Sequence, residues 1–194
     1  PHTISIPRLE PAQGSDVAST PPYPVSDSDL LRIIAVLRLA VPYTGIILST
    51  RESPELRRRA FDLGVSQVSA GSCTSPGGYS DKEALAQFSL GDHRSLDEVV
   101  RDIIECGYIP SFCTSCYRLG RTGHDFMDLA KPGEIAQKCG PNALLTLREY
   151  LDDFASEETR RLGYALLERE LSASAASSQA RASCQRRLAV RSEM

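Results

Sequence analysis

Apolar residues in the first 70 positions alternate between the spacing of strands and the spacing of helices. Three short β-rich runs, His2–Ile6, Gly45–Ser49 and Val65–Ala70, predict three strands. Between the first two runs, apolar residues recur at near-helical intervals and predict a helix over 28–41. The apolar residues of this helix are Leu30, Leu31, Ile33, Ile34, Leu37 and Val41. The preceding range, Glu10–Asp27, is rich in Pro and Ser and contains Gly14, so we expect a linker there.

Residues typical of helix ends flank these segments. The helix over 28–41 has Asp27 or Ser28 available as N-cap. A second helix follows the second strand, with Ser53 as N-cap and Pro54 in its first turn. Strand, helix, strand, helix, strand with short connections is the pattern of parallel βαβ units. We therefore expect an α/β fold whose three strands form half a barrel or the edge of an open sheet.

The second half of the chain is predicted to be helical. A helix ending at Cys106 leads into a fourth extended run, Tyr108–Phe112. The range 122–171 has helical composition, which we expect to be interrupted at Pro132 and Pro141. The helix after Pro141 is expected to bury Leu144, Leu145, Leu147 and Leu151.

The last segment, 172–194, changes in composition. It is rich in Ser and Ala, carries several arginines and shows no apolar periodicity. Because such a segment buries too little surface to offset the entropy of ordering, we predict a disordered tail in which Cys184 is an incidental thiol.

Composition narrows the class of protein. The chain has 194 residues, 41% of them hydrophobic, which is enough for a core of ordinary size. Its net charge of −3 gives no reason to expect nucleic acid or an anionic membrane as partner. No apolar run approaches the ~20 residues of a membrane span, so we expect a soluble protein.

Three of the six cysteines have the spacing of metal ligands. Cys113 and Cys116 form a C-x2-C pair, and Cys139 follows after twenty-two intervening residues. An iron–sulfur cluster can be held by three thiolates, because its fourth iron then takes an exogenous ligand. Structural zinc needs a fourth protein ligand, for which His124 and His93 are the available histidines. Reduced cysteines without a metal are the third alternative.

The residues around these cysteines carry a family resemblance. The sequences from Cys113 to Lys131 and from Cys139 to Leu151 closely resemble the C-terminal region of the HydG family of [FeFe]-hydrogenase maturases, which are radical S-adenosylmethionine (SAM) tyrosine lyases. The resemblance also covers PHTISIPRL at the first residue, LSTRE at Leu48 and SAGS at Ser69, and it ends near Leu171. The related thiamine-pathway tyrosine lyase shares the shorter motifs, but the cysteine triplet favours the HydG type.

The resemblance implies a fold and three ranges. Residues 1–108 would be the C-terminal half of a (β/α)8-type radical SAM barrel, within a biotin and thiamin synthesis-associated domain. Residues 109–171 would be a helical domain in which the cysteine triplet binds an auxiliary 4Fe–4S cluster, and 172–194 would be the tail.

The resemblance also implies two sites at opposite ends of the barrel strands. At the C-terminal ends, where barrel enzymes carry their chemistry, polar residues would bind tyrosine or SAM, and an Arg suits a bidentate carboxylate contact. These residues are Ser5, Arg8, Ser49, Arg51, Ser69, Gly71 and Ser72. His2, at the N-terminal end of its strand, would be a catalytic residue that ligates a labile extra iron on the auxiliary cluster. Without the resemblance, the alternative for His2 is a structural histidine at a strand end. For Arg51, a surface ion pair with Glu52 or Glu55 is the alternative.

The activity implied is cleavage of L-tyrosine to p-cresol and dehydroglycine, followed by formation of carbon monoxide and cyanide for the hydrogenase. SAM, a second 4Fe–4S cluster and other maturation proteins would take part, in the cytoplasm of an anaerobic bacterium or in an algal chloroplast. The chain lacks the C-x3-C-x2-C motif of the SAM-reducing cluster. We therefore expect it to be part of a longer enzyme and to be inactive alone. The alternative class is a noncatalytic module stabilised by zinc or a cluster.

Overall fold

The computed structural model describes residues 2–12, 14–76, 78 and 86–173. The chain divides into two compact units, Pro1–Leu96 and Asp97–Met194. The domain boundary at 108 that the sequence suggests stays a prediction. No helix in the described ranges is both long enough and apolar enough to cross a membrane.

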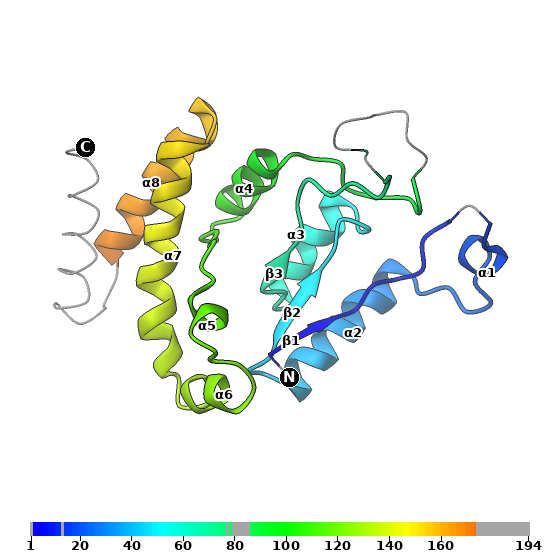
Figure 1. The fold of residues 1–194 in the computed structure, drawn as a ribbon, viewed down its shortest axis with the longest axis horizontal. Coiled ribbons are helices and arrows are strands. Elements are labelled where there is room, and N and C mark those ends of the chain that lie inside the picture. Colours follow the sequence, from blue (N-terminus) through cyan, green and yellow to red (C-terminus); the bar gives the residue numbers. More distant parts are fainter. Residues whose placement is uncertain (1, 13, 77, 79–85, 174–194) are drawn as a thin grey trace. The chain divides into compact units, whose positions relative to one another are not determined.

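The first unit contains a small parallel sheet in the order β1-β2-β3 (Figure 1). Its strands are β1 (Thr3–Ser5), β2 (Gly45–Leu48) and β3 (Gln67–Val68). Thr3 pairs with Gly45, and Leu48 pairs with Val68, so the three strands run in one direction. The mixed α/β class and the parallel βαβ order are therefore confirmed, although each strand is shorter than the apolar run that predicted it.

Two helices provide the crossovers of this sheet, α2 (Asp27–Ala40) and α3 (Pro54–Asp62). Their apolar faces pack with β2 into one core. That core consists of Leu30, Leu31, Ile34, Ile46, Leu48, Leu56, Ala60 and Val65. The linker ahead of α2 contains one short helix, α1 (Asp16–Ser19), which the sequence had not indicated.

Local capping explains where these two helices begin. The Ser53 side chain accepts a hydrogen bond from the backbone N–H of Leu56 at 3.3 Å, and Pro54 occupies the first turn of α3 as predicted. The cap of α2 is Ser26, whose Oγ accepts from the backbone N–H of Asp29 at 3.2 Å. The expectation of Asp27 or Ser28 as cap was therefore wrong by one or two residues.

The second unit is helical. It contains most of α4 (Leu96–Glu105), then α5 (Ser115–Arg118), α6 (His124–Ala130), α7 (Glu134–Asp153) and α8 (Glu157–Ala173) (Figure 1). Its core comprises Val100, Ile104, Leu144, Leu147, Tyr150, Leu151, Ala155, Leu166 and Leu167. Leu145, expected in this core, is partly buried against it.

One expectation for this unit was wrong, and another lies outside the described residues. The extended run predicted at 108–112, all of it described, lies in no helix and joins no sheet. Pro141 lies inside α7 and does not end it. A proline in a helix costs roughly 3 kcal/mol through one lost backbone bond and a clash, but the leucines that follow Pro141 are buried against α8 and offset this cost. The predicted tail falls outside the described residues beyond 173.

Candidate functional site

The C-terminal edge of the sheet brings predicted ligand residues together. Ser49 and Ser69 directly follow Leu48 and Val68, which are register partners. The backbone N–H of Ser69 donates to the Leu48 carbonyl at 3.2 Å. Ser5 is the last residue of β1 and pairs with Ile47, so it approaches the same edge. The three serines therefore share one end of the sheet because its strands are parallel.

Arg51 lies in the loop that leaves this edge. Its backbone N–H donates to Ser49 Oγ at 3.3 Å, and its Nη1 donates to the Arg8 carbonyl at 3.1 Å. Its guanidinium carbon lies 4.3 Å from the centre of the Phe88 ring. Among the described residues, the Nε and Nη2 of Arg51 make no hydrogen bond. Donors are therefore left for a bidentate contact with a carboxylate.

Arg8, by contrast, is engaged by protein groups. Its Nε donates to Glu52 Oε1 at 3.2 Å, its Nη2 donates to Glu52 Oε2, and its Nη1 bonds Asp27 Oδ1 at 2.8 Å. The hydrogen bonds that Arg8 donates to Glu52 raise the pKa of Arg8, which therefore stays charged. Glu52 is only 1% exposed. Its carboxylate is used by Arg8, so the surface pair of Arg51 with Glu52 is not the arrangement found.

A third carboxyl group lies near these two arginines. Burial, and then the negative charge of Glu52, raise the pKa of Glu10, while Arg8 and Arg51 act to lower it. This acidic neighbour, like Phe88, was missed from the sequence, and Glu52 was named there only as a possible partner of Arg51. No local motif marks Glu10 or Phe88, since each becomes part of the site only through the fold.

The loop after β3 holds the remaining predicted residues. Gly71 has φ +59° and donates its backbone N–H to the Arg94 carbonyl at 3.2 Å. The left-handed backbone favours glycine at this position. Ser72 is half-buried beside it. Gly77 and Tyr79, further along this loop, lie outside the described residues.

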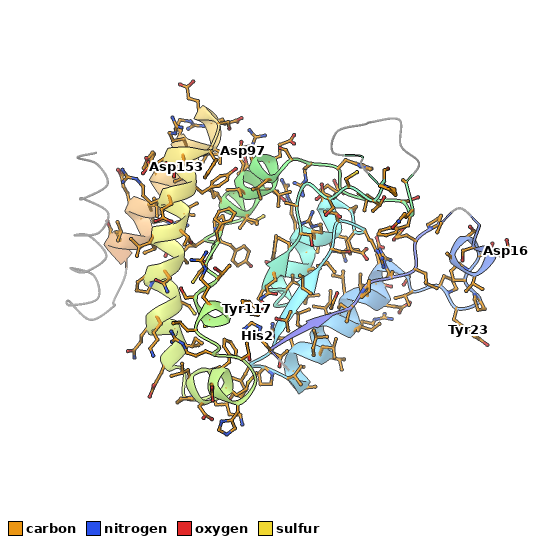
Figure 2. All side chains as sticks on the ribbon, viewed as in Figure 1. His2, Asp16, Tyr23, Asp97, Tyr117 and Asp153 are labelled. Atoms are coloured by element: carbon orange, nitrogen blue, oxygen red, sulfur yellow. The ribbon has the colours of Figure 1, made fainter. Side chains whose placement is uncertain are left out.

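His2 lies at the N-terminal end of the same sheet. Its Nδ1 is 2.8 Å from Thr3 Oγ1, and its carbonyl accepts the backbone N–H of Gly45 at 3.0 Å. Figure 2 labels His2 where the chain enters β1. The ring is therefore separated from Ser49 and Ser69 by the length of the strands, as the sequence predicts.

The cysteine triplet belongs to the second unit. Cys113 precedes α5, Cys116 lies within α5, and Cys139 lies near the start of α7. Burial, and then the charges of Cys116 and Cys113, raise the pKa of the Cys139 thiol, while Arg121 acts to lower it. The pKa of Cys139 therefore responds to both of the other cysteines of the triplet.

The donor set of this region is three thiolates, the ligand type of iron–sulfur clusters. No group of three or more His, Cys, Asp or Glu in the described residues is arranged to hold one metal ion. The cysteine ligands of a cubane cluster bind different irons and need not converge on one point. Of the two candidate zinc ligands, His124 has its Nδ1 3.0 Å from Asp128 Oδ2.

The loop that carries Cys113 is anchored on α7. The backbone N–H of Phe112 donates to Thr146 Oγ1 at 3.2 Å. The Phe112 ring stacks on Tyr150 with 4.9 Å between ring centres. Helix α7 thus carries Cys139 and also contacts Phe112, the residue before Cys113.

The fold and these two sites fit a known class of protein. The family model of the Biotin and Thiamin Synthesis associated domain matches residues 5–109, and the chain belongs to this family. Among curated proteins, it is 37% identical to the 2-iminoacetate synthase of Escherichia coli and 36% identical to that of Salmonella typhimurium, in each case over 110 residues. Each match covers 56% of this chain but only 28% of the relative.

Two solved structures extend the likeness to the cysteine region. One is a crystal structure of HydG, a maturase of the [FeFe]-hydrogenase, with a TM-score of 0.91 and 47% identity. It covers 100% of this chain, which in turn spans 42% of that protein. The second is HydG from Carboxydothermus hydrogenoformans, with a TM-score of 0.72 and 38% identity over 95% of this chain and 38% of that one. The structural neighbours are thus hydrogenase maturases, as the cysteine triplet suggests.

Proposed function

We propose that this chain is the C-terminal portion of a HydG-type radical SAM tyrosine lyase. One observation carries the proposal. The likeness to HydG extends over the whole chain and so includes Cys113, Cys116 and Cys139, which lie beyond the domain shared with other family members at 5–109. In this proposal, the three-stranded sheet belongs to a (β/α)8-type barrel whose other strands, C-x3-C-x2-C cluster and most SAM contacts lie in sequence outside these residues.

At the C-terminal edge of the sheet, Arg51 would bind the carboxylate of tyrosine or SAM. Its half-buried guanidinium is held in one orientation by Phe88 and by the Arg8 carbonyl, while Nε and Nη2 remain available within the described part of the chain. A planar guanidinium held in this way accepts a carboxylate with little loss of side-chain entropy. Ser5, Ser49, Ser69, Gly71 and Ser72 would supply the surrounding hydroxyl and backbone donors. Arg8, engaged by Glu52, would support Arg51 through its carbonyl.

At the other site, Cys113, Cys116 and Cys139 would hold an auxiliary 4Fe–4S cluster, and His2 would ligate a labile iron attached to it. When bound, the cluster would provide the iron at which the small fragment of tyrosine becomes carbon monoxide and cyanide. The Thr146 hydroxyl and the Tyr150 ring would fix the Cys113 loop before the cluster binds. The partners would be other hydrogenase maturation proteins in the cytoplasm of an anaerobe or in a chloroplast.

A second candidate is the thiamine-pathway activity of the 2-iminoacetate synthases. The 37% identity with the Escherichia coli enzyme over 110 residues favours it. Both activities release p-cresol from tyrosine, so only the formation of carbon monoxide and cyanide distinguishes them.

The test is anaerobic reconstitution of the 194-residue chain with iron and sulfide. Wild type should show the paramagnetic signal of a reduced 4Fe–4S cluster, and Ser at Cys113, Cys116 or Cys139 should sharply lower bound iron and sulfide, because two thiolates hold a cubane poorly. Cys106→Ser and Cys184→Ser are the matched controls and should change neither quantity. About one zinc per chain without sulfide would refute the proposal in favour of a zinc module, and equal iron loss in triplet and control variants would refute the ligand assignment.

A further inference from the structure

The Asp92 carboxylate is the centre of a buried ionic network in the first unit. Asp92 is 1% exposed, and so is Arg57 of α3. Arg57 Nη1 donates to Asp92 Oδ2. Arg94 donates to Oδ1 from its backbone N–H at 3.0 Å and from Nε at 2.9 Å, and to Oδ2 from Nη2 at 2.8 Å. Burial acts to raise the pKa of Asp92, but the hydrogen bonds from Arg94 and the charge of Arg57 outweigh it, so the pKa is lowered and the group stays ionised.

This network contacts the loop after β2. The backbone N–H groups of Gly91 and Asp92 both donate to the Thr50 carbonyl, at 3.0 and 2.9 Å. A Cβ atom at position 91 would lie 2.5 Å from the Arg51 carbonyl oxygen, so only glycine permits this approach. The backbone of Arg51 is therefore packed directly against the segment that Asp92 fixes.

The same network contacts the loop after β3. Arg57 Nη2 donates to the Ser69 carbonyl. The backbone N–H of Gly71 donates to the carbonyl of Arg94, whose side chain is held by Asp92. One buried carboxylate thus connects two of the segments that carry predicted ligand residues of the C-terminal edge, the loops after β2 and β3.

Stability alone does not explain this arrangement. Removing charges from water costs several kcal/mol per ion, and a buried ion pair often contributes no more to stability than well-packed apolar residues would. What such a pair provides is a defined geometry, since each arginine donor must meet a particular oxygen. Here the same ion pairs set the positions of two loops that follow different strands, the loop of Arg51 and the loop of Ser69.

We propose that Asp92, with Arg57 and Arg94, is a positioning group that holds the 49–51 and 69–72 loops in the arrangement required to bind the amino-acid ligand. This role rests on the proposed function for the identity of the ligand. We call this network of Asp92, Arg57 and Arg94 the brace, and its existence rests only on the contacts of the first unit. None of the three residues needs to touch the ligand.

The variant that tests the brace is Arg94→Gln. It removes two side-chain bonds to Asp92 but leaves the Arg57 pair and the Arg94 backbone contacts, so the unit should still fold. Arg32→Gln is the matched control, because Arg32 forms an exposed pair with Asp29 on α2 at 3.2 Å. Asp92→Asn is the stronger variant, and its fold is checked by melting before it is interpreted.

Hydrogen exchange of the 194-residue chain is the first measurement. In Arg94→Gln the amides of Gly71, Gly91 and Asp92 should exchange about tenfold faster, and in Arg32→Gln they should not change. The second measurement is tyrosine cleavage by the full-length protein, where kcat/KM should fall about tenfold in Arg94→Gln while bound iron stays at the wild-type level.

The outcomes distinguish failure of the positioning role from failure of the proposed function. Unchanged exchange in Arg94→Gln would overturn the brace. Faster exchange with unchanged kcat/KM would overturn the positioning role. If the wild-type full-length protein neither binds nor cleaves tyrosine while exchange in Arg94→Gln is faster, the proposed function fails, and the positioning role for that ligand fails with it.

Discussion

Replacing Asp97 should destabilise the second unit in a way that depends on pH. The Asp97 carboxylate joins the start of α4 to α7 and α8. Its Oδ1 accepts from Tyr150 Oη at 3.0 Å and from the Ser156 backbone N–H at 3.3 Å. Its Oδ2 accepts from Ser156 Oγ at 2.6 Å and from Thr159 Oγ1 at 2.8 Å. Tyr150 is 7% exposed and Thr159 is 0% exposed, so both hydroxyls depend on this carboxylate.

The expected magnitude follows from these contacts. Asp97→Ala leaves the buried hydroxyls of Tyr150 and Thr159 without their acceptor, and each such loss costs roughly 1–3 kcal/mol. Thr159 retains a contact with Ser156 Oγ at 3.1 Å, and water reaches part of the carboxylate, so the lower end applies. We expect the free energy of unfolding of the second unit to fall by about 2 kcal/mol.

The pKa of Asp97 sets the pH dependence. Burial acts to raise this pKa, but hydrogen bonds from Ser156, Thr159 and Tyr150 outweigh it, so the folded-state pKa lies below the ordinary value. A carboxylate with a lowered folded-state pKa contributes stability above its unfolded pKa of about 3.9 and loses that contribution as pH falls through the folded value. The difference between wild type and Asp97→Ala should therefore be full at pH 7 and shrink below about pH 4.

Native-state hydrogen exchange is the suitable assay, because a chain with two compact units need not unfold in one step. At pH 7, amides in the middle of α7 and α8 should exchange about 30-fold faster in Asp97→Ala, the equivalent of about 2 kcal/mol. Glu149→Gln, an exposed acidic change on α7, is the control and should have little effect. Unchanged exchange at pH 7, or a difference that persists undiminished at pH 3, would show that the carboxylate does not connect these helices.

Three further predictions concern other parts of the molecule. Arg51→Lys in the full-length protein should weaken tyrosine binding or turnover by roughly 1–3 kcal/mol, because the charge remains but the fork is lost; unchanged kinetics in Arg51→Ala would remove Arg51 from the site. His2→Ala in the full-length protein should still release p-cresol, measured by chromatography, yet lose much of the iron carbonyl and cyanide product, measured by infrared spectroscopy. Loss of p-cresol with auxiliary iron intact would place His2 at the tyrosine site. Gly163→Ala should destabilise α8 by about 1–2 kcal/mol, because its Cβ would lie 2.5 Å from Cδ2 of the fully buried Leu151. Slower exchange of the α8 amides in this variant would contradict the prediction.

The elements predicted well from the sequence are those whose signals are local. Helix α3 has Ser53 at its N-cap and Pro54 in its first turn, and both residues act within three positions of one another. The parallel order also followed from local periodicity, since strands and helices alternate with short connections. His2 and Arg51 were assigned to opposite ends of the sheet for the same reason.

The parts that were missed depend on contacts between distant positions. Glu52 and Asp92 are acidic residues that usually face water, and only their pairing with Arg8 and Arg57 makes burial possible. Nothing within a few residues of either one indicates its partner. Pro141 was expected to end a helix by a local rule, but packing of α7 on α8 outweighs that rule.

Helix α7 continues through Pro141 and carries both Cys139 and the anchor of the Cys113 loop. The number of residues between these two positions therefore sets the directions in which they project. Cys139 and Thr146 are seven positions apart, which is close to two full turns, so both project from nearly the same side of the helix. Removing or inserting one residue between them would turn Cys139 by about 100° away from the anchor of the Cys113 loop. A substitution at Pro141 leaves this register intact, whereas a single deletion beside it should abolish cluster loading in an otherwise folded chain. Length, more than residue identity, is therefore the property of this stretch that evolution of the cysteine site is expected to preserve.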